Sequence, residues 1–197
     1  DPASAGAAVV QAIYRELARA MALRAAGPSA DIVLGRGLSG ASSLGSFHFR
    51  IQGEVVAAAE AASAPWFDGD VDRDRQLAGA AARAVERLRR DLGDDPGRWR
   101  WGALHQIEFA HPLRAVPGLG KWLSRGPYAF GGDVNTVAQS AEALWQDDGQ
   151  VLIAPGYRQV IDLADWDRAR FMLPTGNSGI PGHPRYDDCV ADYLAGR

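Results

Sequence analysis

The sequence has little of what disulfide-stabilised, metal-binding and membrane-spanning proteins need. Its 197 residues include one cysteine, Cys189, which allows neither an internal disulfide nor a site of several thiolate ligands. No run of about 18 apolar residues is present, so no membrane-spanning helix is expected. No basic stretch leads into an apolar one, as it would in a signal peptide. The net charge of -3 argues against a nucleic-acid partner.

Histidine is scarce as well, and its spacing is unlike that of a metal site. The four positions are His48, His105, His111 and His183, and no two are separated as in His-x-x-x-His. His105 and His111 flank Glu108, but residues 105 and 108 would lie on opposite faces of a strand. A metal-dependent hydrolase built on these three residues therefore ranks last among our hypotheses, and no metal ligand is predicted.

Two short motifs have the letters of a binding site without its context. Gly35-Arg36-Gly37-Leu38-Ser39-Gly40 matches Gly-x-Gly-x-x-Gly, but no helix is expected after it, so no dinucleotide site is predicted. The acidic stretch from Asp68 to Asp74 begins like a calcium loop, yet Arg73 stands where that loop needs glycine. We interpret these carboxylates as groups that stabilise the start of the following helix.

The possible nucleophiles are isolated from catalytic partners. There is no Gly-x-Ser-x-Gly motif, and the nearest match, Gly176-Asn177-Ser178-Gly179, predicts a tight turn in which Ser178 bonds to the backbone. Cys189 stands beside Val190 in a predicted helix, which favours a packed thiol over a nucleophile. The residues by themselves predict no self-contained active site.

Hydrophobic periodicity predicts helices in the first half of the chain. Apolar residues at spacings of three and four indicate a helix over 4–23, with Val10, Leu17 and Met21 on its apolar face and Arg15 on its polar face. A Gly- and Ser-rich loop is expected over 31–46. Further helices are expected over 55–62, from the acidic stretch to residue 92, and over 186–194.

After Pro96 the pattern becomes extended. The segment from Trp99 to Phe109 is β-prone, and strands are expected over 134–138, 151–153, 157–163 and 169–173, with an antiparallel hairpin joining the last two. The sequence therefore predicts an α+β fold. A mainly helical segment occupies residues 1–97, and antiparallel strands with a closing helix occupy residues 98–197.

The closing segment contains Leu173-Pro174-Thr175-Gly176-Asn177-Ser178-Gly179 and then Tyr186-Asp187-Asp188. These residues resemble the end of the penicillin acylase (penicillin amidase) family. In that family the segment reads as a strand ending in Leu-Pro-x-Gly-Gln-Ser-Gly, then His-Tyr-x-Asp-Gln and a helix. Asn177, Arg185 and Cys189 replace the family's Gln, His and Gln.

Further motifs follow the family's order and make the match specific. Trp99-Arg100-Trp101-Gly102 with His105 resembles its Trp-x-Trp-Gly-x-x-His, and Phe109 with His111-Pro112 resembles Phe-x-His-Pro. Gly132-Asp133 with Thr136-Val137 resembles Gly-Asp-x-x-Thr-Val. Residues 157–163 are similar to the strand that precedes the closing segment.

This resemblance implies the C-terminal portion of an αββα N-terminal-nucleophile hydrolase sandwich. In that family a precursor cuts itself into an α and a β chain. The new N-terminal serine of the β chain then attacks an amide, with its own α-amine as base. The motif order places that serine, the oxyanion-binding groups and the calcium ligands upstream. The resemblance therefore implies no catalytic residue and no cofactor in this chain.

The resemblance also implies what the chain works with. Its partners would be the α chain, the N-terminal part of the β chain and a small N-acyl substrate, in a periplasmic or secreted enzyme. We hypothesise that the segment around Asp133 and Asn135 approaches the active cleft. Because the chain begins at Asp1 and opens directly into a helical pattern, we expect a processed subunit or an excised segment.

Two questions stay open at the level of sequence. The alternative to an acylase segment is a catalytically inactive relative or a stand-alone structural or binding module. The substrate is equally undecided between a β-lactam, an acyl-homoserine lactone and another N-acyl compound, because the acyl pocket is built mainly upstream.

Overall fold

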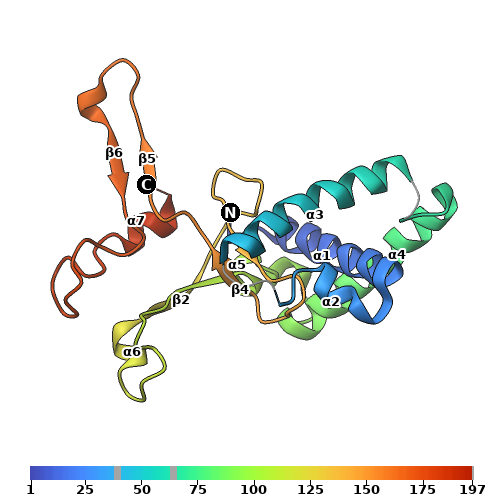
Figure 1. Cartoon of the computed structure of the whole chain (residues 1–197), viewed down its shortest axis with the longest axis horizontal. Helices are drawn as coiled ribbons and strands as arrows, with labels where there is room; N and C mark the ends of the chain where they lie inside the picture. The colour runs from blue at the N-terminus through green and yellow to red at the C-terminus, as the bar shows by residue number, and fades with distance from the viewer. Residues whose placement is uncertain (38–40, 63–65, 197) are drawn as a thin grey trace.

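A computed structural model describes residues 1–37, 41–62 and 66–196, with the backbone alone for 41–49 (Figure 1). Three long helices lie together at one end: α1 (Ala5–Ala26), α3 (Ala41–Ala61) and α4 (Gly69–Leu92). A small sheet follows them, and a two-stranded hairpin with the last helix projects at the opposite end. This mixture of helices with a sheet confirms the α+β class.

Helices α1 and α4 pack against each other through small side chains. α1 begins where the Ser4 hydroxyl accepts a hydrogen bond from the Ala7 amide, at 3.0 Å. The contact with α4 buries Ala8, Ala12 and Ala84 almost completely, because alanines let two helix axes approach closely. Leu88 of α4 lies fully buried in the same cluster.

The predicted faces of α1 were wrong at two positions. Val10 is 63% exposed, whereas Arg15, expected on the polar face, is 3% exposed. The reason is that α1 is covered by α4 along one side and contacts residues 142–147 along another. The buried surface of the helix therefore does not coincide with its predicted apolar stripe: it includes Arg15 and leaves Val10 exposed.

Helix α3 begins earlier than the sequence predicted, since residues 41–54 were expected to be loop or undefined. Glycine and serine disfavour a helix locally. Val55 and Ala58 nevertheless pack against Leu17 and Met21, and this tertiary contact stabilises the helix as a unit. The short helices η1 (Gly27–Ser29) and α2 (Ala30–Val33) lead toward it, and residues 38–40 of the glycine motif lie outside the described residues.

The central sheet has the strand order β2-β1-β4-β3. Its strands are β1 (Gln106–Phe109), β2 (Arg125–Ala129), β3 (Ala141–Glu142) and β4 (Gln150–Ile153). β1 pairs antiparallel with β2, and β3 with β4, but β1 and β4 are parallel. The prediction of purely antiparallel strands was wrong for that pair. Parallel neighbours need a long connection, and residues 110–149 are long enough to let β4 run in the same direction as β1.

Three local assignments also differ from the sequence prediction. Residues 134–138, predicted as a strand, form a turn in which the Asp133 carboxylate accepts from the Val134 amide and the Thr136 hydroxyl accepts from the Asp133 amide. Trp101–Leu104 forms a helical turn, α5, after the short helix η2 (Pro96–Arg98). β2 follows α6 (Gly120–Leu123) in a Pro- and Gly-rich stretch for which no strand was predicted.

The predicted hairpin is confirmed near the C-terminus. β5 (Arg158–Val160) pairs antiparallel with β6 (Arg170–Met172), and η3 (Trp166–Arg168) lies in the connection between them. The last helix, α7 (Val190–Ala195), is shorter than predicted because residues 187–189 form a turn. Its Tyr193 hydroxyl donates to the Pro155 carbonyl at 2.7 Å, and its ring is buried with Ile107 and Phe130.

Within the described part of the chain, none of the helices combines the length and the apolar character that crossing a membrane requires.

Candidate functional site

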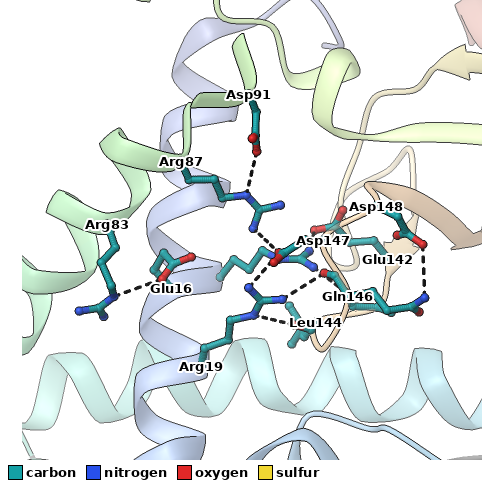
Figure 2. A network of polar contacts seen from close by, with 12 residues as sticks. Glu16, Arg19, Arg83, Arg87, Asp91, Glu142, Leu144, Gln146, Asp147 and Asp148 are labelled. Carbon is teal, nitrogen blue, oxygen red and sulfur yellow. Dashed lines mark hydrogen bonds and ion pairs between the residues drawn. The ribbon is translucent and has the colours of Figure 1, made fainter. Parts of the chain in front are cut away.

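Buried charges gather where α1 meets the segment that follows β3 (Figure 2). Arg15 of α1 forms an ion pair with Glu142, and the two side chains are 4% and 11% exposed. A second nitrogen of the same guanidinium donates to the Ala143 carbonyl at 2.8 Å. Burial lowers the pKa of Arg15, and the neighbouring Glu142 carboxylate opposes that shift.

Asp147 is shared by arginines from two helices. Figure 2 shows Arg19 of α1 and Arg87 of α4 directed at its carboxylate, at 2.8 and 2.9 Å. The Arg15 Nε lies 3.6 Å from the same oxygen. Burial would raise the pKa of Asp147, but Arg19, Arg87 and Arg15 outweigh it, and the pKa is lowered. We call these five residues the ionic junction: Arg15, Arg19, Arg87, Glu142 and Asp147.

The ionic junction holds a loop in place and does not transfer protons. Arg19 also donates to the carbonyls of Leu144 and Gln146, at 2.8 and 3.1 Å, so its hydrogen bonds follow the backbone of the loop. Permanently charged guanidinium groups neither accept nor release protons near neutral pH. The arrangement therefore fixes residues 142–147 against α1 and α4.

A second grouping resembles a Ser-His-acid catalytic triad. It consists of Ser140, His105 and Glu142, the last of which also belongs to the junction. His105 Nε2 lies 2.9 Å from the Ser140 hydroxyl, and His105 Nδ1 lies 3.6 Å from Glu142. This grouping was not predictable from the sequence, because Ser140 stands 35 residues from His105 and no motif surrounds it.

The hydrogen bonds of this trio run in the wrong direction for His105 to activate Ser140. The Ser140 hydroxyl donates its single proton to the Gly131 carbonyl at 3.2 Å, so it accepts from His105, and Nε2 carries a hydrogen. A base that already holds the proton cannot remove the one on serine. Ser140 and His105 are also 0% and 1% exposed, with the His105 ring stacked on Trp101 at 4.4 Å. We assign the trio a structural role.

Asp133 and Asn135, the hypothesised residues of the cleft, lie together in the turn after β2. Asp133 accepts from Gln11 of α1 at 2.7 Å and from Gln52 of α3. Asn135 in turn donates to the side-chain oxygen Oε1 of Gln52. The pair thus joins the turn to two helices, and its approach to a substrate cleft stays a prediction.

Ser178 occupies the predicted turn. Its amide donates to the Arg185 carbonyl at 3.0 Å, and its hydroxyl accepts from the Ile180 amide at 3.2 Å. A side chain at Gly176 would overlap the same Arg185 carbonyl, which explains the glycine. The prediction of a backbone-bonded turn serine is confirmed.

Cys189 precedes α7 as its N-cap residue. Its thiol lies 3.8 Å from the Asp188 carboxylate. Burial and that nearby negative charge raise the pKa of the thiol, which keeps it protonated and unreactive. The interpretation as an inert thiol is supported.

The acidic stretch stabilises the start of α4, as interpreted from the sequence. Asp72 accepts from the Asp68 amide at 3.0 Å and from Arg24 at 2.6 Å. The hydrogen bond from that amide, with those from Arg24 and Gln76, lowers the pKa of Asp72 despite some desolvation. Asp70 pairs with Arg73 at 2.8 Å.

The other metal candidates are dispersed. His111 Nδ1 accepts from the Leu113 amide at 3.1 Å, whereas His105 faces Ser140. The side chain of His48 lies outside the described residues. Among the residues that are described, no three His, Cys, Asp or Glu side chains are grouped to hold a metal ion.

Comparison with known proteins gives a consistent result along the chain. The penicillin amidase family model matches residues 1–197. The acyl-homoserine lactone acylase QuiP of Pseudomonas putida is 28% identical over 202 residues, which cover 100% of this chain and 24% of that protein. QuiP of Pseudomonas aeruginosa is 32% identical over 138 residues, covering 64% of this chain and 16% of that protein.

A relative named as a penicillin acylase aligns as well. The penicillin acylase 2 proenzyme of Pseudomonas sp. (strain SE83) is 34% identical over 95 residues, covering 47% of this chain and 12% of that protein. The chain spans at most about a quarter of the length of these relatives. The family match covers both the helical half and the sheet half, including the ionic junction, and this chain belongs to the penicillin amidase family.

Proposed function

We propose that this chain is the C-terminal part of the β chain of an N-terminal-nucleophile acylase that hydrolyses an N-acyl amide. The observation that carries the proposal is the family match over residues 1–197. It is supported by Ser140, whose hydroxyl contacts the His105 ring, because this serine is buried and holds the wrong hydrogen-bond pattern for attack. The nucleophile would then belong to another part of the protein.

The proposed chemistry uses an N-terminal serine outside this chain. Its hydroxyl oxygen bonds to the acyl carbon, and its own α-amine takes the hydroxyl proton and passes it to the leaving amine. The C–N bond breaks and an acyl-ester remains. Water, activated by the same amine, then hydrolyses the ester and frees the carboxylic acid.

Within such an enzyme, this chain would supply part of the αββα sandwich and hold it rigid. The ionic junction fixes the helices to the loop between β3 and β4, which keeps the sheet in one position. Rigid elements matter because small displacements of a site reduce rates strongly. Acyl-homoserine lactones are the first substrates to test, since relatives bear that name.

The test uses the full-length acylase. Purified protein would be analysed by intact mass spectrometry and N-terminal sequencing, then assayed against acyl-homoserine lactones and penicillins. We expect two chains, a β chain that begins with serine, and hydrolysis that is lost when this serine becomes alanine. Ser178→Ala is the matched control and should keep kcat/KM within about twofold, because that hydroxyl bonds only to a turn.

Two results would overturn the proposal. An uncut protein that binds N-acyl compounds without hydrolysing them would favour the inactive-relative alternative. Loss of hydrolysis in Ser178→Ala, with a normal folding transition, would place the nucleophile in this chain.

A further inference from the structure

The hairpin formed by residues 157–172, which we call the arm, projects from the body of the molecule (Figure 1). Its base is anchored, because the Arg158 guanidinium stacks on the Tyr193 ring at 4.3 Å and lies 5.8 Å from the Phe130 ring. Its far end carries η3 and is remote from the helices. The arm is thus held at one end only.

Both faces of the arm expose large apolar side chains. Gln159 pairs with Phe171 and Val160 with Arg170, so Phe171 and Val160 point to opposite faces of the ribbon. They are 70% and 75% exposed. At the far end, Leu163 and Trp166 are 82% and 74% exposed.

A two-stranded ribbon with apolar side chains exposed on both faces is unfavourable in water. An isolated pair of strands is marginally stable, and strands need a further layer or helix to bury an apolar face. Exposed contiguous apolar surface on a folded protein commonly marks an interaction site. Val137, which is fully exposed, also lines a groove of about 1920 Å³ together with Tyr157 and Phe171 of the arm.

We propose that the arm is a docking element that inserts its two apolar faces into the part of the acylase outside residues 1–197. This inference rests on the proposed function, in which that part belongs to the same enzyme. The length of the relatives argues for this occupant. The alignment that covers all of this chain leaves about three-quarters of the P. putida acylase unaccounted for. Exposure on both faces favours insertion between two surfaces over contact with one flat surface.

Charge argues against a lipid surface as the occupant. The arm holds three arginines and three aspartates, so it has no net positive charge to attract anionic lipid. Arg168 and Asp162 also approach each other at 3.6 Å near the far end. Apolar packing, rather than electrostatic attraction, is left as the driving force.

The test places a cysteine at Leu163 of the full-length acylase, in a Cys189→Ser background, and measures maleimide labelling. We expect labelling in the native protein to be at least about tenfold slower than in urea, because a docked side chain reacts only through opening. A second measurement compares Leu163→Asp with the matched apolar control Leu163→Met. The aspartate should lower the melting temperature and the methionine should not, because only the former buries a charge.

Several outcomes would overturn the docking. They are labelling at the rate of the unfolded protein, a neutral Leu163→Asp, protection that disappears on dilution as for a second copy, and protection only with phosphatidylglycerol vesicles. None of these readouts uses hydrolysis. An inactive enzyme with a protected Leu163 would therefore contradict the proposed function alone, and an active enzyme with a freely labelled Leu163 would contradict the docking alone.

Discussion

At the scale of residues, Arg15 shows how a charge is accommodated inside this protein. A buried guanidinium is costly unless a carboxylate and hydrogen-bond acceptors surround it. Arg15 has Glu142, Asp147 and the Ala143 carbonyl. Removing one member therefore does more damage than losing a single contact, since the remaining charge stays in a desolvated position.

We predict that Arg15→Ala lowers the free energy of unfolding of the full-length protein by about 3–5 kcal/mol, since the buried Glu142 loses its guanidinium. The matched control is Arg36→Ala, whose exposed side chain pairs with the exposed Asp31 at 3.1 Å and should cost about 0–1 kcal/mol. Urea denaturation measures both. Equal effects of the two variants would show that burial of the Arg15 pair is unimportant.

At the scale of elements, the turn over residues 131–140 connects β2 to β3 and carries Asp133. Gly132 has φ near +87°, and a Cβ there would overlap the Ala138 carbonyl oxygen. The Ser140 amide also donates to the Asp133 carbonyl at 3.1 Å, which closes the turn. Glycine is required both by the backbone angle and by the space.

We predict that Gly132→Ala destabilises the protein more than Gly118→Ala does. Both glycines have similar positive φ, but nothing lies near a Cβ at Gly118. The shared backbone strain is about 1–2 kcal/mol, and the overlap at Gly132 should add about 1–3 kcal/mol. Thermal unfolding followed by circular dichroism compares them, and matching melting temperatures would contradict the expected overlap.

Elements with a strong local signal were predicted well, and those that depend on packing were not. The hairpin of β5 and β6 was predicted correctly, because a short segment of turn-forming residues separates its two strands. The strand expected at 134–138 failed because Asp133 and Thr136 offer side-chain hydrogen bonds that compete with a sheet. The early part of α3 was missed because tertiary contacts override weak helix formers.

At the scale of the whole molecule, the ionic junction unites the two halves of the chain. Arg15, Arg19 and Arg87 belong to the helical half, whereas Glu142 and Asp147 belong to the half with the sheet. The division into residues 1–97 and 98–197 stays a prediction, and this junction supports the expectation that both belong to one domain. Charge pairing across the halves also makes their association sensitive to acid.

We predict that acid weakens this association through Asp147. Its pKa is lower in the folded state than the ordinary value of 3.8, so its contribution to stability is fully present above pH 3.8. That contribution is lost as the pH falls below 3.8 through the lowered pKa, because the proton binds the unfolded state more tightly. Asp147→Asn should therefore show a shallower loss of stability with acid.

The measurement is the free energy of unfolding across the acidic range for the parent protein and both variants. Asp148→Asn is the matched control, since its carboxylate accepts from Gln146 and from the Gln150 amide rather than from arginine. We expect this control to keep the acid dependence of the parent protein. An unchanged slope in Asp147→Asn would contradict the role of the junction.

The sequence by itself determined the α+β class, the helical and extended halves, the turn at Ser178 and the family. These follow from periodicity and short motifs, which are local properties of a chain. Only the tertiary structure decided that Arg15 is buried, that β1 and β4 are parallel and that Ser140 meets His105. Each depends on residues far apart in the sequence, and their contact is set by packing, which no local pattern records.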